Sequence, residues 1–106
     1  MTAQGTDGEV DFAYLEGYMA GDRQVVGEVL SLFRQQAQAW AGSLDPGDPG
    51  WRDVVHTIKG AARGVGARRL GDLCTQAEAQ GAEGLPVVRA ALEAVVAEIA
   101  AYQARA

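Results

Sequence analysis

Apolar residues recur at intervals of three and four along almost the whole chain, and this periodicity is the strongest constraint on its fold. Such spacing places apolar side chains on one face of an α-helix, whereas a half-buried strand alternates apolar and polar residues. No segment reads as an alternating strand. The sequence therefore predicts an all-α protein.

Five helices are predicted, separated by residues that favour turns. A short one covers residues 10–20, and the others carry apolar stripes over residues 26–40, 51–65, 70–77 and 88–102. Asp22 is a predicted N-cap, and the Pro- and Gly-rich segment 43–50 is a predicted loop. Asp48-Pro49 is predicted to start the third helix. Because short loops make successive helices antiparallel neighbours, we expect an antiparallel four-helix bundle with a short additional N-terminal helix.

The 106 residues suit one domain, with residues 1–9 as a flexible polar tail and residues 10–106 as the folded bundle. A net charge of −5 disfavours a nucleic acid partner, because phosphate binding needs a basic surface. A single cysteine and a single histidine give no disulfide framework and no predicted metal site. No apolar run is long enough for a membrane span and no signal peptide is visible, so a cytoplasmic location is expected.

His56 lies inside the third predicted helix and is expected to point outward. At about 100° per residue, the apolar Val54 and Ile58 lie roughly 160° to 200° away from it. The glycine and the cations of this stretch share the histidine's side of the helix, within about 60° of it: Arg52, Lys59, Gly60 and Arg63. A mid-helix glycine costs about 0.5–1 kcal/mol relative to alanine, and at position 60 it opens space beside the imidazole.

Basic charge is concentrated around this histidine. Residues 52–69 contain five basic residues and one acidic residue, whereas the rest of the chain contains four basic and 13 acidic residues. Lys59 and Arg63 could stabilise negative charge placed on the ring. Each feature taken alone is also typical of an ordinary solvated helix face, but their conjunction favours a functional site.

The run from His56 to Leu70, HTIKGAARGVGARRL, resembles the histidine-containing phosphotransfer (HPt) domain of two-component phosphorelays. The family pattern is histidine, any residue, Leu or Ile, Lys-Gly, two small residues, two further residues, an aliphatic residue and glycine. The matching positions are His56, Ile58, Lys59, Gly60, Ala61, Ala62, Val65 and Gly66. Gly21-Asp22 before a helix, and Leu73-Cys74 followed by Glu78, are also typical of the family.

The resemblance implies a four-helix bundle that carries an exposed phosphoacceptor, His56. A receiver domain's aspartyl phosphate would donate the phosphoryl group to Nε2, and another receiver aspartate would then accept it. Lys59 would hold the phosphoryl oxygens, and Gly60 would leave room for the receiver's loops. The implied partners are response-regulator receiver domains, a hybrid histidine kinase, or both. The Mg²⁺ of the reaction would belong to the receiver, with no cofactor held by this chain.

Three positions leave alternatives open. Arg63 stands where many relatives have a small or polar residue, so it is compatible with an added phosphate contact or with an obstruction to docking. Family members often carry a supporting polar residue on the following helix, and Gln76 and Gln80 are the two candidates here. Cys74 falls on an apolar stripe and is predicted to be a buried thiol.

The absence of a nucleotide-binding motif predicts a phosphotransfer intermediate without its own kinase activity. The alternative is a non-catalytic module that docks receivers, or a helical adaptor. A module that only docks receivers would be indicated by loss of the histidine or the lysine, and both residues are present. Each helix has a single apolar stripe, which is already needed for the core, so no apolar face is left for association with a second copy and a monomer is expected.

Overall fold

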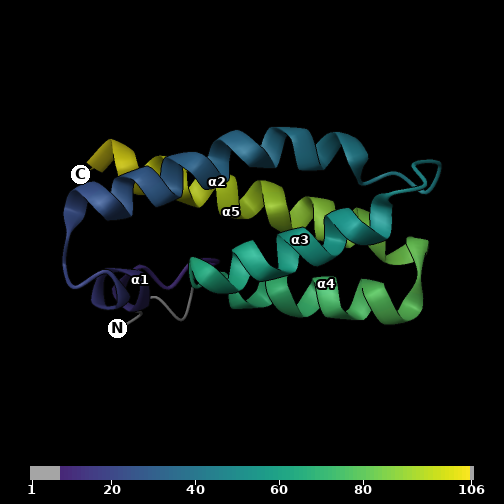
Figure 1. Cartoon of the computed structure of the whole chain (residues 1–106), viewed down its shortest axis with the longest axis horizontal. Helices are drawn as coiled ribbons and strands as arrows, with labels where there is room; N and C mark the ends of the chain where they lie inside the picture. Colours follow the sequence, from purple (N-terminus) through teal and green to yellow (C-terminus); the bar gives the residue numbers. More distant parts are fainter. Residues whose placement is uncertain (1–7, 106) are drawn as a thin grey trace.

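The computed structural model describes residues 8–105, and within that range the chain is helical with no strand. Its helices are α1 (Phe12–Tyr18), α2 (Arg23–Ser43), α3 (Trp51–Gly64), α4 (Arg68–Gln80) and α5 (Leu85–Arg105), with a 3₁₀ turn, η2 (Ala82–Gly84), before α5. The four long helices run side by side along the molecule, with α2 and α5 on one side and α3 and α4 on the other (Figure 1). The predicted antiparallel four-helix bundle is confirmed.

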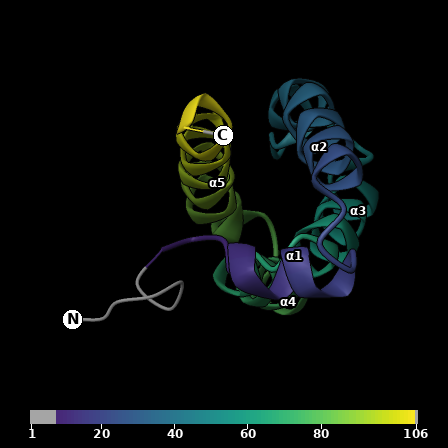
Figure 2. The same ribbon diagram turned by 90° about the vertical axis from the view of Figure 1, so that its left-hand side faces the viewer.

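The short helix α1 lies across one end of the bundle, near the turn that joins α3 to α4 (Figure 2). The Asp11 side chain caps α1 by accepting from the Tyr14 N–H at 3.0 Å, and the Asp11 N–H donates to the Gly66 carbonyl at 3.0 Å. Gly66 has φ +84°, and a Cβ there would lie 3.0 Å from the Asp11 carbonyl oxygen. A glycine at this turn therefore allows the end of α3 to contact the segment that leads into α1.

The predicted helix boundaries agree with the structure at most positions. The Asp22 side chain accepts from the Val25 N–H at 3.1 Å, which confirms it as the N-cap of α2. Gly81 ends α4 with φ +109°, a conformation that glycine adopts readily. The start of α3 was predicted too early, because Asp48 accepts from the Gly50 N–H at 2.8 Å in a turn and α3 begins at Trp51.

Of the predicted N-terminal tail, residues 1–7 lie outside the described residues. The part that is described is held against the bundle, because the Glu98 carboxylate accepts from the backbone N–H groups of Glu9 and Val10 at 2.8 and 2.9 Å. The Glu9 carboxylate in turn accepts from Arg69 at 3.2 Å, and Val10 is buried. Glu9 and Val10 are therefore anchored to the side chain of Glu98 on α5.

The core is made by the inward faces of all five helices and by apolar residues of the connecting segments, and within residues 8–105 every buried side chain is apolar. On α3 the buried residues are Val55, Ile58 and Ala62, and on α4 they include Leu70, Cys74 and Ala77. Burial of this stripe fixes the rotation of α3, so its opposite face is presented to solvent. Among the described helices, none has an apolar stretch of the length needed to cross a bilayer.

Candidate functional site

His56 projects from the middle of α3 on the side away from the core. Its side chain is 72% exposed, whereas the neighbouring core residues Val55 and Ile58 are fully buried. The outward orientation predicted from the helical period is therefore confirmed. Because the core face of α3 is packed inside the bundle, the helix backbone holds the imidazole on the solvent side.

The imidazole is held from α4 by Glu78. Its Nδ1 lies 3.0 Å from the Glu78 Oε2, and Lys59 Nζ donates to the other carboxylate oxygen, Oε1, at 2.6 Å. The hydrogen bond from Lys59 lowers the pKa of Glu78 most, and the one from His56 lowers it further. Glu78 is therefore an ionised acceptor that bridges the histidine on α3 and the lysine one turn later.

This bridge determines which ring nitrogen is available for chemistry. An ionised carboxylate can only accept, so the contact with Glu78 places a proton on Nδ1. In the neutral imidazole the lone pair then lies on Nε2, the nitrogen farther from the backbone. Within residues 8–105, Nε2 of His56 has no hydrogen-bond partner. The geometry thus provides an exposed, oriented nucleophile.

Gly60 keeps the surface beside this nucleophile open. It is exposed, and a Cβ built on it would meet no atom within 4 Å apart from its own helix backbone and chain neighbours. Close packing against another helix therefore does not explain the glycine. The open space fits the predicted role, which is to let another molecule approach the ring closely.

The two flanking arginines are placed differently from each other. Arg52 Nη1 donates to the backbone carbonyl of Glu78 at 3.0 Å, and its guanidinium lies 4.5 Å from the centre of the Trp51 ring. Arg52 thus ties the start of α3 to the part of α4 that carries Glu78. Arg63, two turns after His56, donates to the Thr75 hydroxyl of α4 at 3.2 Å.

The polar partner on the following helix is Glu78 rather than Gln76 or Gln80. Both glutamines are exposed, and the hydrogen bonds of the described residues include none between either of them and His56. The reason is helical geometry: residues two positions away lie about 160° around the helix, so both amides lie on the far side of α4 from Glu78. Glu78 borders the buried stripe of α4 and faces α3.

Cys74 lies one turn before Glu78 and is fully buried, as predicted. Burial raises the pKa of its thiol to about 11, and the negative charge of Glu78 contributes to the increase. The thiol is therefore protonated at neutral pH and faces the core. Within residues 8–105, no cluster of three or more His, Cys, Asp or Glu side chains is arranged to hold a metal ion.

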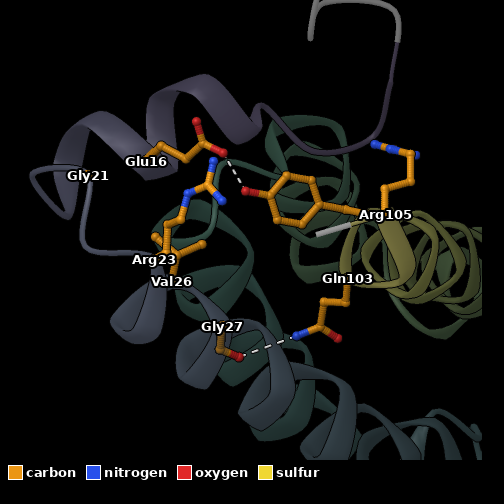
Figure 3. Close-up of a pocket in the computed structure, with 8 residues that line it drawn as sticks. Glu16, Gly21, Arg23, Val26, Gly27, Gln103 and Arg105 are labelled. Carbon is orange, nitrogen blue, oxygen red and sulfur yellow. Dashed lines mark hydrogen bonds between the residues drawn. The ribbon is translucent and has the colours of Figure 1, made fainter.

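A cavity of about 640 Å³ lies at the other side of the bundle, between α1, α2 and α5 (Figure 3). Two hydrogen bonds cross it: Tyr102 donates to Glu16, and the Gln103 amide donates to the Gly27 carbonyl at 3.3 Å. None of its lining residues belongs to α3 or α4. The cavity is therefore separate from the histidine site.

Comparison with known proteins agrees with this site. A sequence model described as the Hpt domain matches residues 24–105. The chain belongs to the Hpt domain family. The crystal structure of histidine phosphotransferase ShpA from Caulobacter crescentus superimposes on this Hpt domain with a TM-score of 0.84 and 59% sequence identity. The match covers 92% of this chain and 93% of ShpA, and a comparison with curated proteins found no significant match.

Membership of the family gives the site its biological setting. Hpt domains are relay carriers in two-component systems, where they interact with response regulators and histidine kinases. This Hpt domain is thus a phosphorelay intermediate.

Proposed function

We propose that His56 accepts a phosphoryl group on Nε2 from the aspartyl phosphate of a receiver domain and passes it to the aspartate of another receiver. The observation that carries this proposal is the exposed imidazole whose Nδ1 is bonded to Glu78. We further propose that the chain acts as a cytoplasmic monomer with no nucleic acid partner, and that the Mg²⁺ of the reaction is held by the receiver.

In the transfer step, the Nε2 lone pair attacks phosphorus in line with the bond to the aspartyl oxygen. The P–Nε2 bond forms, the P–O bond breaks, and the aspartate leaves as a carboxylate. The ring becomes a cation that keeps its Nδ1 proton. Glu78 therefore does two things: it orients the nucleophile, and its negative charge stabilises the positive charge that the ring acquires. Transfer onward is the same step in reverse.

Lys59 is the cation best placed to contact the transferred group. Its side chain is 19% exposed and uses one of its three N–H donors on Glu78. The remaining donors can reach phosphoryl oxygens on the ring one turn away. Such contacts neutralise charge on the oxygens of a loose transition state, where catalysis comes mostly from positioning and electrostatics.

The test is transfer from a phosphorylated receiver domain to the purified chain, compared with His56→Gln. The side chain of His56 is exposed, so this substitution is not expected to disturb folding, and circular dichroism checks that. We expect acid-labile, base-stable label on the wild type and none on the variant. Equal label on both proteins would place the phosphoacceptor elsewhere.

A second arm tests whether the chain has kinase activity of its own. The purified protein is incubated with labelled ATP and Mg²⁺ without any other protein, and we expect no label on His56. Label that appears on the wild type and disappears in His56→Gln would contradict the assignment as a carrier only.

A further inference from the structure

The basic residues around His56 differ in whether a carboxylate neutralises them. Three of the five have acidic partners: Lys59 with Glu78 at 2.6 Å, Arg69 with Glu9 at 3.2 Å, and Arg68 with Asp11 at 3.8 Å. Arg52 is held by a backbone carbonyl and by the face of Trp51. Within the described part of the chain, the remaining cation, Arg63, is bonded only to a neutral hydroxyl.

Arg63 is nevertheless held in a defined place. Its side chain crosses α4 over Gly71, where a Cβ would lie 3.1 Å from Arg63 Cγ and 3.3 Å from Nε. Its Nη2 then donates to the Thr75 hydroxyl at 3.2 Å, and that hydroxyl donates to the Gly71 carbonyl at 3.2 Å. A glycine inside a helix costs about 0.5–1 kcal/mol relative to alanine. At position 71 it provides the channel in which the arginine stem lies.

The held guanidinium lies at the edge of the histidine site. Arg63 follows His56 by seven residues, which is the same helix face and about 10 Å further along α3. Thr75 precedes Glu78 by three residues, about 4.5 Å along α4. One of the five guanidinium N–H donors is used by Thr75, so a fork of donors is free to bind a carboxylate with two parallel hydrogen bonds.

We propose that Arg63 is a docking residue that binds a carboxylate on the partner receiver, beside the receiver's phosphorylated aspartate, and so helps to determine which receivers this chain uses. The proposal rests on the proposed function. Lys59 lies between Arg63 and His56 on α3, and Gly71 and Thr75 hold the guanidinium over α4 instead of beside the ring. Arg63 therefore contributes to binding of the receiver, whereas Lys59 contacts the transferred phosphoryl group.

The experiment measures phosphotransfer from a receiver domain phosphorylated with acetyl phosphate, with KM for the receiver and kcat determined separately. Arg63→Ala is expected to raise KM about fivefold to tenfold with kcat unchanged, because a charged rim contact acts mainly on encounter and affinity. Arg63→Lys should recover part of the loss, since it keeps the charge but not the fork. The difference between Arg63→Ala and wild type should shrink as salt is raised to 0.5 M.

The matched control is Arg34→Ala. Arg34 is also an exposed arginine bonded to a neutral side chain, the Gln103 amide at 2.8 Å, but it lies on α2 facing α5. Arg34→Ala therefore also removes one positive charge, but at a place away from the histidine site, and it should change KM less than twofold. Gly71→Ala keeps the charge of Arg63 but obstructs its stem, so it should raise KM by a few fold. Circular dichroism confirms that each variant is folded.

The outcomes separate this inference from the proposed function. If the wild type is labelled on His56 and Arg63→Ala behaves like Arg34→Ala, the docking role is wrong and the relay function stands. A fall in kcat at unchanged KM would make Arg63 a phosphoryl contact instead and also overturn the inference. If no receiver labels the wild type, the relay proposal fails. The docking role can then still be tested by calorimetry with unphosphorylated receiver, where Arg63→Ala should raise Kd and Arg34→Ala should not.

Discussion

Replacing Glu78 by alanine should slow phosphotransfer to His56 about tenfold. The change removes the acceptor that orients the ring through Nδ1 at 3.0 Å and the negative charge that balances the phosphorylated ring. A hydrogen bond to a charged group contributes about 1.5–3 kcal/mol. The His56 side chain is 72% exposed, so in the variant water replaces part of the lost hydrogen bond. We therefore take a loss of transition-state stabilisation of about 1.4 kcal/mol, which corresponds to a factor of ten in rate.

Glu78→Gln divides this effect into its two parts. The amide oxygen can still accept from Nδ1, but the charge is gone, and charge-assisted hydrogen bonds are roughly twice as strong as neutral ones. We therefore expect a loss of roughly threefold, half of the tenfold effect in free energy. The assay is single-turnover transfer from excess phosphorylated receiver. Glu93→Ala, which removes an exposed carboxylate on α5, is the control and should stay within twofold of wild type.

Two results would refute this reasoning. Wild-type transfer by a folded Glu78→Ala variant would show that the carboxylate neither orients nor stabilises the ring. A slower rate for Glu78→Gln than for Glu78→Ala would show that acceptance from Nδ1 is not the relevant contact.

The remaining predictions concern pH, packing and access. The lowered pKa of Glu78 means that its ionised form stabilises the fold above the ordinary value of 4.5 and loses that effect as pH falls through the lowered value. The stability advantage of wild type over Glu78→Gln in urea unfolding should therefore shrink on acidification, and growth of the difference would contradict this. Gly60→Ala should raise the unfolding free energy by about 0.5–1 kcal/mol, whereas Gly60→Trp should weaken receiver binding without unfolding the chain; equal binding by both would refute the access role. Ile58→Ala should lower the free energy of unfolding by about 2–5 kcal/mol, because it leaves a cavity in the core. A loss below about 1 kcal/mol would mean that the surrounding core collapses to fill the cavity. Cys74, with its thiol pKa raised to about 11, should react with a maleimide at pH 7 much more slowly in the native chain than in urea; equal rates would place the thiol at the surface.

The sequence was sufficient to predict the bundle because local signals and the apolar period agree. Asp22 shows this: its side chain caps α2 as predicted, and the stripe that follows it is buried. The start of α3 was misplaced because Asp48 can cap either a helix or a tight turn. Here its carboxylate accepts from Gly50 only two residues later, so the helix is delayed to Trp51.

At the site, the exposed histidine could be predicted from periodicity on one helix, whereas its partner depends on how two helices are rotated against each other. Gln76 and Gln80 were the two candidates for the supporting polar residue, and the sequence did not decide between them. A signal for Glu78 was present: it lies about 40° from Cys74 around α4, at the border of the apolar stripe, where a side chain can reach α3. The path of Arg63 over Gly71 had no such signal, because it depends on side-chain contacts across the α3–α4 interface.

The central claim is that the phosphoryl group resides on Nε2 of His56. It is tested most directly by long-range ¹H–¹⁵N NMR of the ¹⁵N-labelled chain, phosphorylated by a receiver, because phosphorylation of Nδ1 and of Nε2 gives different ring nitrogen shifts. We predict one phosphohistidine, substituted at Nε2, with Nδ1 protonated and bonded to Glu78. Substitution at Nδ1, or label on another residue while His56 stays unmodified, would contradict the account.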